Sequence, residues 1–424
     1  MDKIVALAKR RGFIFQSSEI YGGITGFWDY GPLGVELKNN IKKEWWKTMV
    51  YDRENVVGID AAIVMNPIVW EKSGHLKAFT DPLVECKLCH QRFRADKTEE
   101  INNHGKVKHP GVLIEMTEAR NFNLLVKVEL GVVDKQDAYL RGEITQGAFV
   151  NFQNIVSSSR VKIPFGIAQI GKAFRNEVTP GNFTFRSREF EQMELEYFIE
   201  PNDQEGDKCF NELKEQRMMW YLNLGIKPSH LKFKRHEKDE IAHYARRAED
   251  IIYSAPFGWS ELEGIHHRGD WDLTRHNLKY KNQQTGEEFT PWVIETSGGV
   301  DRALLFFLLE AYKEVGSRRL LQLHPKLAPY KTAVFPLVAN KPELVNEAKK
   351  IYLDLKKQFN VAWDDRGNIG KRYFAQDEIG TPFCVTIDYQ SLEDKTVTVR
   401  DRDTMKQARI ETSQLVNYLV DKFK

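Results

Sequence analysis

The stretch that decides the fold reads Phe174-Arg175-Asn176-Glu177 and, eleven residues after Arg175, Arg186-Ser187-Arg188-Glu189-Phe190. Apolar residues alternate on both sides of it, which predicts two strands within residues 163–198. The run Thr179-Pro180-Gly181-Asn182 between them predicts a turn. The expected hairpin presents arginines and a phenylalanine on adjacent strands, a shape suited to a nucleotide, because a guanidinium matches phosphate and keeps its charge. This segment alone leaves an ordinary charged hairpin face as the alternative.

Composition narrows the class of protein. A chain of 424 residues is too long for one compact core, so two or three domains are expected. The formal charge of +2 gives no general attraction to nucleic acid, so such a partner must meet a local patch. Four cysteines argue against a disulfide framework, and the longest apolar run, 303–309, is far shorter than a membrane span. We therefore expect a cytoplasmic protein that has no membrane partner.

Periodicity divides the chain into two parts. Residues 31–50 predict a helix whose apolar stripe can pack on its own domain or on another subunit. Strands are expected at 56–65 and 124–133, helices at 202–224 and 303–312, and a polar insertion near 81–110. Pro325 and Pro329 mark a boundary, after which strands and helices alternate. That alternation predicts a separate α/β domain.

One possible metal site lies in the polar insertion. Cys86 and Cys89, followed by His104 and His109, have the spacing of a two-Cys, two-His zinc site. The histidines lie in a sequence typical of a loop, without the apolar residues that a small zinc module needs. We therefore expect an insertion without metal and keep zinc as the alternative.

A second candidate ligand site runs from Glu295 to Arg302. Its glycines lie between an expected strand and an apolar helix, where the backbone can approach a ligand and the helix start favours an anion. A tight turn with a surface arginine is the alternative. The sequence has no Gly-x4-Gly-Lys-Ser/Thr phosphate loop and no dinucleotide motif after a strand. A nucleotide would therefore lie on a sheet surface.

Taken together, these segments resemble the homodimeric glycyl-tRNA synthetases, which are class II aminoacyl-tRNA synthetases. The resemblance covers essentially the whole chain and is most specific over residues 27–34, 167–177, 188–194 and 376–382. It implies an α+β fold with an antiparallel six-stranded sheet flanked by helices over residues 1–325, carrying an insertion at about 82–118. It also implies an α/β anticodon-binding domain with a mixed five-stranded sheet over residues 330–424.

The same resemblance implies ATP-dependent attachment of glycine to tRNA(Gly) through a glycyl-adenylate. Mg²⁺ is the implied cofactor, and a second copy of the chain is expected to pack at the helix that starts at Pro32. The implied catalytic residues are Arg175 and Arg302. The implied ATP set is Arg175, Asn176, Glu177, Phe185, Arg186, Ser187, Arg188, Glu189, Phe190, Glu261, Leu262, Gly299, Val300, Asp301 and Arg302. The implied glycine set is Arg94, Glu143, Phe190, Glu191, Gln192, Met193, Glu194, Glu295, Thr296, Ser297, Gly298 and Gly299.

By this resemblance, Arg175 contacts the α-phosphate, Glu177 accepts from the adenine amino group, and Phe190 stacks on adenine. Arg186 and Arg302 hold the outer phosphates, and Glu261 acts through Mg²⁺. Gly142, Thr296, Ala119 and Ala375 depart from the family pattern, and the first two loosen the backbone beside substrate carboxylates. The competing hypothesis is a synthetase-derived accessory protein that binds nucleic acid without catalysis. Dinucleoside polyphosphate synthesis is a possible side activity.

Overall fold

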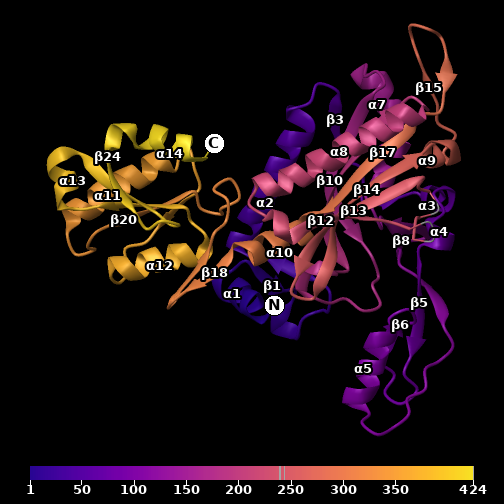
Figure 1. The fold of residues 1–424 in the computed structure, drawn as a ribbon, viewed down its shortest axis with the longest axis horizontal. Coiled ribbons are helices and arrows are strands. Elements are labelled where there is room, and N and C mark those ends of the chain that lie inside the picture. The colour runs from indigo at the N-terminus through magenta and orange to yellow at the C-terminus, as the bar shows by residue number, and fades with distance from the viewer. Residues whose placement is uncertain (238–239, 243, 424) are drawn as a thin grey trace.

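The computed structural model of the chain describes residues 1–237, 240–242 and 244–423, so residue 424 of the second expected domain lies outside the described residues. One seven-stranded sheet organises the larger part of the molecule (Figure 1). Its order is β12 (Leu231–Arg235), β13 (Arg247–Ala255), β14 (Gly258–Gly269), β17 (Trp292–Gly299), β11 (Glu189–Ile199), β10 (Phe165–Phe174) and β3 (Val56–Ile59). Neighbours from β12 to β10 are antiparallel, as expected, and β3 adds a parallel edge strand beside β10.

The decisive hairpin is formed by β10 and β11, which pair from Phe165 opposite Phe198 to Phe174 opposite Glu189. The expected position of the arginines is wrong in one respect. Arg175 and Arg186 lie in the connection between the strands, whereas Phe190 lies on β11. The connection is longer than the four-residue turn because it includes the short helix η3 (Phe183–Phe185). The arginines therefore gather at the end of the hairpin.

Four helices share the main apolar core on one face of the sheet. They are α1 (Asp2–Arg11), α2 (Pro32–Trp46), α8 (Asp203–Asn223) and α10 (Val300–Ala311). The apolar stripe of α2, including Leu37 and Ile41, is fully buried in the same core as α10. The stripe therefore packs within its own domain. Helix α2 continues into η2 (Lys47–Tyr51) at its end, so the expected helix over 31–50 is confirmed.

The insertion projects from the larger part as a small module (Figure 1). It contains β5 (Thr80–Glu85), β6 (Arg92–Arg94), α5 (Thr98–Lys108) and β7 (Arg120–Asn123), and the three strands pair in the order β6-β5-β7. The expectation of a loop around the histidines is wrong for His104, which lies on α5. Val84, Cys86 and Phe93 form a small buried cluster beside it.

A second three-stranded sheet lies beside the insertion, in the order β4 (Val64–Met65), β9 (Gln136–Leu140) and β8 (Val126–Leu130). The single strand expected at 56–65 is therefore two strands, β3 and β4, in different sheets. The remaining short elements of this part are β1 (Ile14–Gln16), η1 (Glu19–Tyr21), β2 (Trp28–Tyr30), α3 (Pro67–Lys72), α4 (His75–Ala78), α6 (Thr145–Val150), α7 (Phe152–Ser159), η4 (Pro228–His230), α9 (Trp271–Arg275), β15 (Tyr280–Lys281) and β16 (Glu288–Phe289).

The C-terminal part contains the expected mixed five-stranded sheet, drawn in orange and yellow in Figure 1. Its order is β21 (Val361–Trp363), β20 (Thr332–Pro336), β22 (Phe383–Ile387), β23 (Thr396–Asp401) and β24 (Gln407–Glu411). Strand β20 is parallel to both neighbours, and the pairs β22–β23 and β23–β24 are antiparallel. The helices are α11 (Pro342–Leu355), α12 (Ile369–Ile379), α13 (Tyr389–Asp394) and α14 (Leu415–Phe423), preceded by η5 (Thr412–Gln414).

The two parts meet at α12, through the specific run 376–382. Strands β18 (Tyr312–Val315) and β19 (Arg318–Leu321) form a hairpin beside α12. Asp377 of α12 is fully buried and accepts from Nε of Arg318, the first residue of β19, at 2.7 Å. Glu378 accepts from Arg10 and Arg11 of α1. These ion pairs fasten the C-terminal part to the larger one. In the described part of the chain, no helix is long and apolar enough to cross a membrane.

Candidate active site

A pocket of about 260 Å³ opens on the face of the central sheet opposite α2, α8 and α10, beside α6, which packs on part of the same face. Its wall is built from β11, β13, β14, β17, the β10–β11 connection and the start of α10. The lining residues are Glu143, Thr145, Arg175, Glu177, Thr184, Phe185, Arg186, Ser187, Phe190, Gln192, Glu194, His236, Tyr244, Asp250, Glu261, Gly264, His266, Arg268, Glu295, Ser297, Gly299, Asp301 and Arg302.

Strand alternation places the polar side chains on this face. Side chains two residues apart on a strand share a face, so Gln192, Glu194 and Glu196 of β11 lie together. Met193 and Leu195 point to the opposite face and belong to the apolar core. Register then sets Glu194 opposite Ser297 on β17. The pocket is the polar side of an otherwise apolar sheet.

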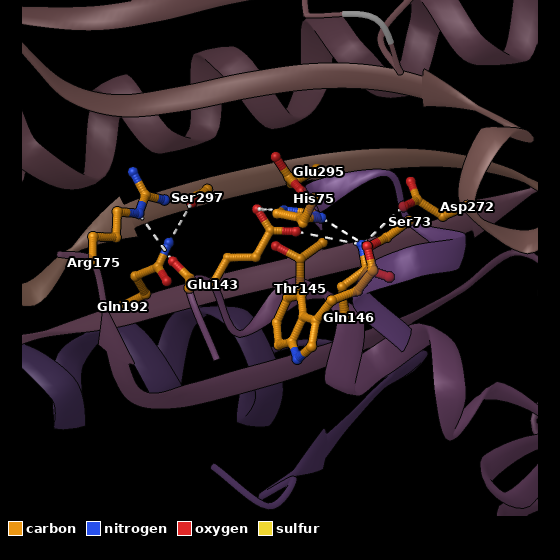
Figure 2. A network of polar contacts seen from close by, with 12 residues as sticks. Ser73, His75, Glu143, Thr145, Gln146, Arg175, Gln192, Asp272, Glu295 and Ser297 are labelled. Atoms are coloured by element: carbon orange, nitrogen blue, oxygen red, sulfur yellow. Dashed lines mark hydrogen bonds and ion pairs between the residues drawn. The ribbon is translucent and has the colours of Figure 1, made fainter. Parts of the chain in front are cut away.

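One end of the pocket, which we call the carboxylate end, consists of Glu143, Thr145, Glu194, Glu295 and Ser297. Figure 2 shows four of these side chains, Glu143, Thr145, Glu295 and Ser297, together with Gln192. Glu194 accepts from Thr145 Oγ1 at 2.7 Å and from Ser297 Oγ at 2.5 Å. Gln192 Nε2 donates to the same carboxylate at 2.7 Å. Three buried glutamates share a space that water reaches poorly.

The three glutamates differ in their pKa values. Burial, with the nearby charges of Glu295 and Glu143, raises the pKa of Glu194 to about 8. Burial opposes ionisation of Glu143 too, but His75 and two arginines outweigh it and hold its pKa well below the usual range. Burial likewise opposes ionisation of Glu295, whose pKa is nevertheless lowered by Arg268 and His266. Near pH 7 the carboxylate end therefore holds two charged glutamates and one mostly protonated glutamate.

A buried support lies behind the carboxylate end. Arg268 donates to Glu295 Oε2 at 2.7 Å and to Asp272 Oδ2 at 2.8 Å. Glu196 faces Glu295 across the strands, and burial together with Glu295 raises its pKa well above the usual range. Neither carboxyl oxygen of Glu196 has a hydrogen-bond partner among the described residues. Glu196 does not line the pocket, and we interpret it as a neutral group behind the wall rather than as a group that contacts a ligand.

The other end of the pocket, which we call the arginine end, consists of Arg175, Glu177, Arg186, Phe190, Glu261 and Arg302. The guanidinium of Arg175 lies 5.1 Å from the ring centre of Phe79 and 5.2 Å from that of Phe190. Its Nε donates to the carbonyl of Gly142 at 2.9 Å. The two rings and this hydrogen bond fix the orientation of Arg175, so its remaining donors face the pocket.

Two more cations at the arginine end are paired with carboxylates. Arg302 Nη1 lies 2.9 Å from Glu261 Oε1, and Arg302 lowers the pKa of Glu261. Asp250 lines the same wall, and burial together with Glu261 raises its pKa. Arg186 lies 2.5 Å from Glu177 and 3.3 Å from Asp81. Because Arg302 and Arg186 remain partly exposed, an anion can reach them.

Several residues of the implied substrate sets lie outside the pocket wall. Arg188 braces the connection by donating to the carbonyl of Glu177 at 3.0 Å. Arg94 pairs with Asp81 at 2.7 Å, and Asp81 in turn contacts Arg186 of the pocket wall. The others are Asn176, which is exposed, Glu189 and Glu191, which pair with lysines, and Met193, Leu262, Thr296, Gly298 and Val300, which are in the sheet or core.

Asp301 lines the pocket but is already bonded. It accepts from Tyr30 and from Lys38 Nζ at 2.8 Å. Tyr30 belongs to the specific run 27–34, which continues into the start of α2, and Lys38 lies farther along the same helix. Thr296, a departure from the family pattern, has a buried hydroxyl without a hydrogen-bond partner among the described residues.

Sequence reasoning missed a group of polar wall residues. Those that line the pocket are Thr145, Thr184, His236, Tyr244, Asp250, His266 and Arg268. His75 lies 3.2 Å from Glu143, behind the wall. The signal for some of them was available, because Gly264, His266 and Arg268 alternate along β14 as the glutamates do along β11. His266 contacts one of the glutamates, since its Nδ1 lies 2.5 Å from a carboxylate oxygen of Glu295.

Comparison with known proteins gives a consistent result. Residues 127–312 match the model of the tRNA synthetase class II core domain (G, H, P, S and T), and residues 331–422 match the anticodon binding domain. The chain is 52% identical to the glycine–tRNA ligase of Borreliella burgdorferi, over 99% of this chain and 96% of the relative. It is 50% identical to that of Caldanaerobacter subterraneus, over 100% and 98%, and 48% identical to that of Thermobifida fusca, over the same shares.

Proposed function

The chain belongs to the glycine–tRNA ligase family of class II aminoacyl-tRNA synthetases, and on this basis we propose which residues of the pocket bind glycine and which bind ATP. The enzyme uses ATP to attach glycine to tRNA, and the proposal concerns which residues do so. The observation that carries it is the adjacency of the two ends: buried carboxylates for an ammonium lie beside arginines for phosphates. Arg175 is bonded at Gly142, the neighbour of Glu143, and so stands where the ends meet.

The carboxylate end is proposed to bind glycine. Glycine has no side chain to hold, so its affinity comes from charge-assisted hydrogen bonds to its ammonium and carboxylate. Glu143, Glu194 and Glu295 supply acceptors, and Ser297 with Gln192 holds Glu194 in place. One extra methyl group changes binding by only about 1–3 kcal/mol by attraction. Alanine must therefore be rejected by the closeness of the packed wall around Cα.

The arginine end is proposed to bind ATP. Phe190 offers a ring for stacking on adenine, and Glu177 offers an acceptor for the adenine amino group. Arg186 and Arg302 match the charge of the outer phosphates. Asp250 and Glu261 offer the carboxylate oxygens that Mg²⁺ prefers. Burial together with the charge of Glu261 raises the pKa of Asp250, so a cation beside Asp250 would stabilise its charged form. When bound, Mg²⁺ supplies charge neutralisation of the phosphates.

The proposed reaction uses no protein nucleophile. A carboxylate oxygen of glycine attacks the α-phosphorus, the bond from that phosphorus to the bridging oxygen breaks, and pyrophosphate leaves. A hydroxyl of the terminal ribose of tRNA then attacks the glycyl carbonyl, and AMP leaves. Arg175 stabilises the charge that develops on the α-phosphate, and Arg302 helps to hold the leaving group. Catalysis is orientation plus electrostatic stabilisation.

The larger assembly is part of the proposal. The catalytic domain covers residues 1–325, with an insertion at about 82–118, and the domain over 330–424 binds the anticodon of tRNA(Gly). We propose a homodimer, supported by the exposed apolar side chains Ile20, Tyr21 and Ile24 just before α2. Light scattering of the purified chain tests this. Four free cysteines support a cytoplasmic location.

Amino-acid-dependent exchange of pyrophosphate into ATP tests the proposed substrate. We expect exchange with glycine and little with alanine or serine, followed by charging of tRNA(Gly). Folded protein that gives no exchange with glycine would refute the proposal. That result would favour the non-catalytic accessory protein, which is expected to keep tRNA binding when Arg175 is replaced by alanine.

A further inference from the structure

We propose that Cys86, Cys89, His104 and His109 in the insertion form a tetrahedral zinc site. Their ligand atoms all lie within 4.8 Å of one another. The spacing of these residues matches zinc, but the sequence around them favoured an insertion without metal, because the histidines were expected in a loop that lacks apolar residues. The structure removes that objection by placing His104 on α5 and His109 at its C-terminal end.

The distances match a shared ion. Bond lengths of about 2.3 Å for Zn–S and 2.0 Å for Zn–N place S and N about 3.5 Å apart in a tetrahedron. Cys89 Sγ lies 3.4 Å from His104 Nε2, and Cys86 Sγ lies 3.8 Å from His109 Nε2. Each thiol is thus separated from a different imidazole by about one tetrahedral edge. Two thiolates and two neutral imidazoles would also balance the charge of Zn²⁺.

The local fold directs these atoms toward one point. Cys86 follows β5, and its backbone N–H donates to Gln91 while its carbonyl accepts from His90, both at 2.9 Å. His90 takes a φ of 60°, which closes the turn tightly after Cys89. On the other side, the imidazole of His104 packs on Phe93, with ring centres 4.8 Å apart. Strand turn and helix end therefore face each other across the site.

The module is too small to be held by its apolar core. Its buried cluster contains only Val84, Cys86 and Phe93, with Ala95, Ile101 and Met116 packed against it. So small a core usually needs a metal or a disulfide. Zinc ligation would join the β5–β6 turn to the end of α5, the two halves that this core holds weakly.

The site also bears on the pocket. Strand β6 follows the cysteine turn and carries Arg94, which pairs with Asp81 of β5 at 2.7 Å. Asp81 in turn lies 3.3 Å from Arg186 at the arginine end. Zinc fixes the pairing of β5 with β6 and so keeps Arg94 on Asp81. We expect zinc loss to loosen the module first and to affect ATP binding only indirectly.

Metal analysis of the full chain, purified without chelator, tests the proposal. We expect about one zinc per chain, retained through gel filtration. Cys89→Ser and His109→Ala should each lose it, while Cys209→Ala, in α8, should keep it. Circular dichroism should show that all variants stay folded, because the module projects from the core. In cobalt-substituted protein, we expect the absorption of a tetrahedral thiolate site, and Cys89→Ser should abolish it.

A second measurement separates zinc from the other uses of two neighbouring thiols. Trypsin should cut the zinc-bound insertion slowly and cut it faster after chelation, and added zinc should restore protection. The proposal is overturned if reduced protein takes up no zinc, or if Cys89→Ser and His109→Ala retain it. A disulfide between Cys86 and Cys89 in protein purified under reducing conditions would also overturn it. None of these readouts depends on aminoacylation.

Discussion

The carboxylate end and the arginine end of the pocket are built in opposite ways. Glu194 and Glu295 lie on paired central strands, each only 2% exposed, and are held by hydrogen bonds and Arg268. Arg186 and Arg302 lie on a connection and at a helix start, with side chains 23% and 28% exposed. The first end is rigid and poorly hydrated, and the second is solvated.

This difference fits the two proposed ligands. A small ammonium makes few contacts. Its binding is therefore strongest beside buried carboxylates, because little water competes with the ammonium for them. A triphosphate offers many oxygens, so partly exposed arginines can bind it at little desolvation cost. The high pKa of Glu194 is a consequence of this burial, since desolvation and the charges of Glu295 and Glu143 disfavour its ionised form until a cation arrives.

The largest expected effect comes from the residue between the two ends. We expect Arg175→Ala to lower kcat for pyrophosphate exchange by about 1,000-fold, since a preoriented cation at the reacting phosphate is lost. Arg186→Ala, farther along the arginine end, should mainly raise KM for ATP, by about tenfold. Equal losses of kcat in both variants would show that Arg175 has no special place between the ends. Steady-state exchange kinetics measure both.

A matched pair on β11 tests the carboxylate end. Glu194→Gln should raise KM for glycine by about 100-fold, because a charged partner of the ammonium is lost. Glu196→Gln should change it less than about threefold, because Glu196 is already neutral and behind the wall. A similar rise in KM for glycine in the two variants would contradict the claim that Glu194 contacts glycine whereas Glu196 does not. Both proteins should be checked for unchanged melting temperature.

The smallest expected effect links the insertion to the arginine end. Asp81→Asn should raise KM for ATP by about threefold, because Arg186 and Arg94 lose a shared partner. Asp96→Asn is the control, since Asp96 is exposed and pairs only with Arg94 among the described residues. An unchanged KM in Asp81→Asn would separate the insertion from ATP binding.

Local pattern predicted much of the fold but less of the pocket. The stripe of α2 and the strands of the β10–β11 hairpin follow from periodicity, and both are confirmed. The placement of Arg175 in a connection does not follow, because strand ends depend on pairing across the sheet. Arg268 was missed because its partners, Glu295 and Asp272, lie on other elements. His104 was misjudged because a short polar helix has little apolar pattern to reveal it.

Proton release on glycine binding tests the central claim most directly, namely that crowded carboxylates bind the ammonium. With a pKa of about 8, Glu194 is mostly protonated at pH 7, and an ammonium beside it should lower that pKa. Titration calorimetry with a nonhydrolysable glycyl-adenylate analogue, in buffers of different ionisation enthalpy, should therefore show release of about one proton at pH 7. Release should fall toward zero by pH 9, and affinity should rise with pH up to about 8. No proton release at pH 7, with affinity independent of pH, would contradict the account.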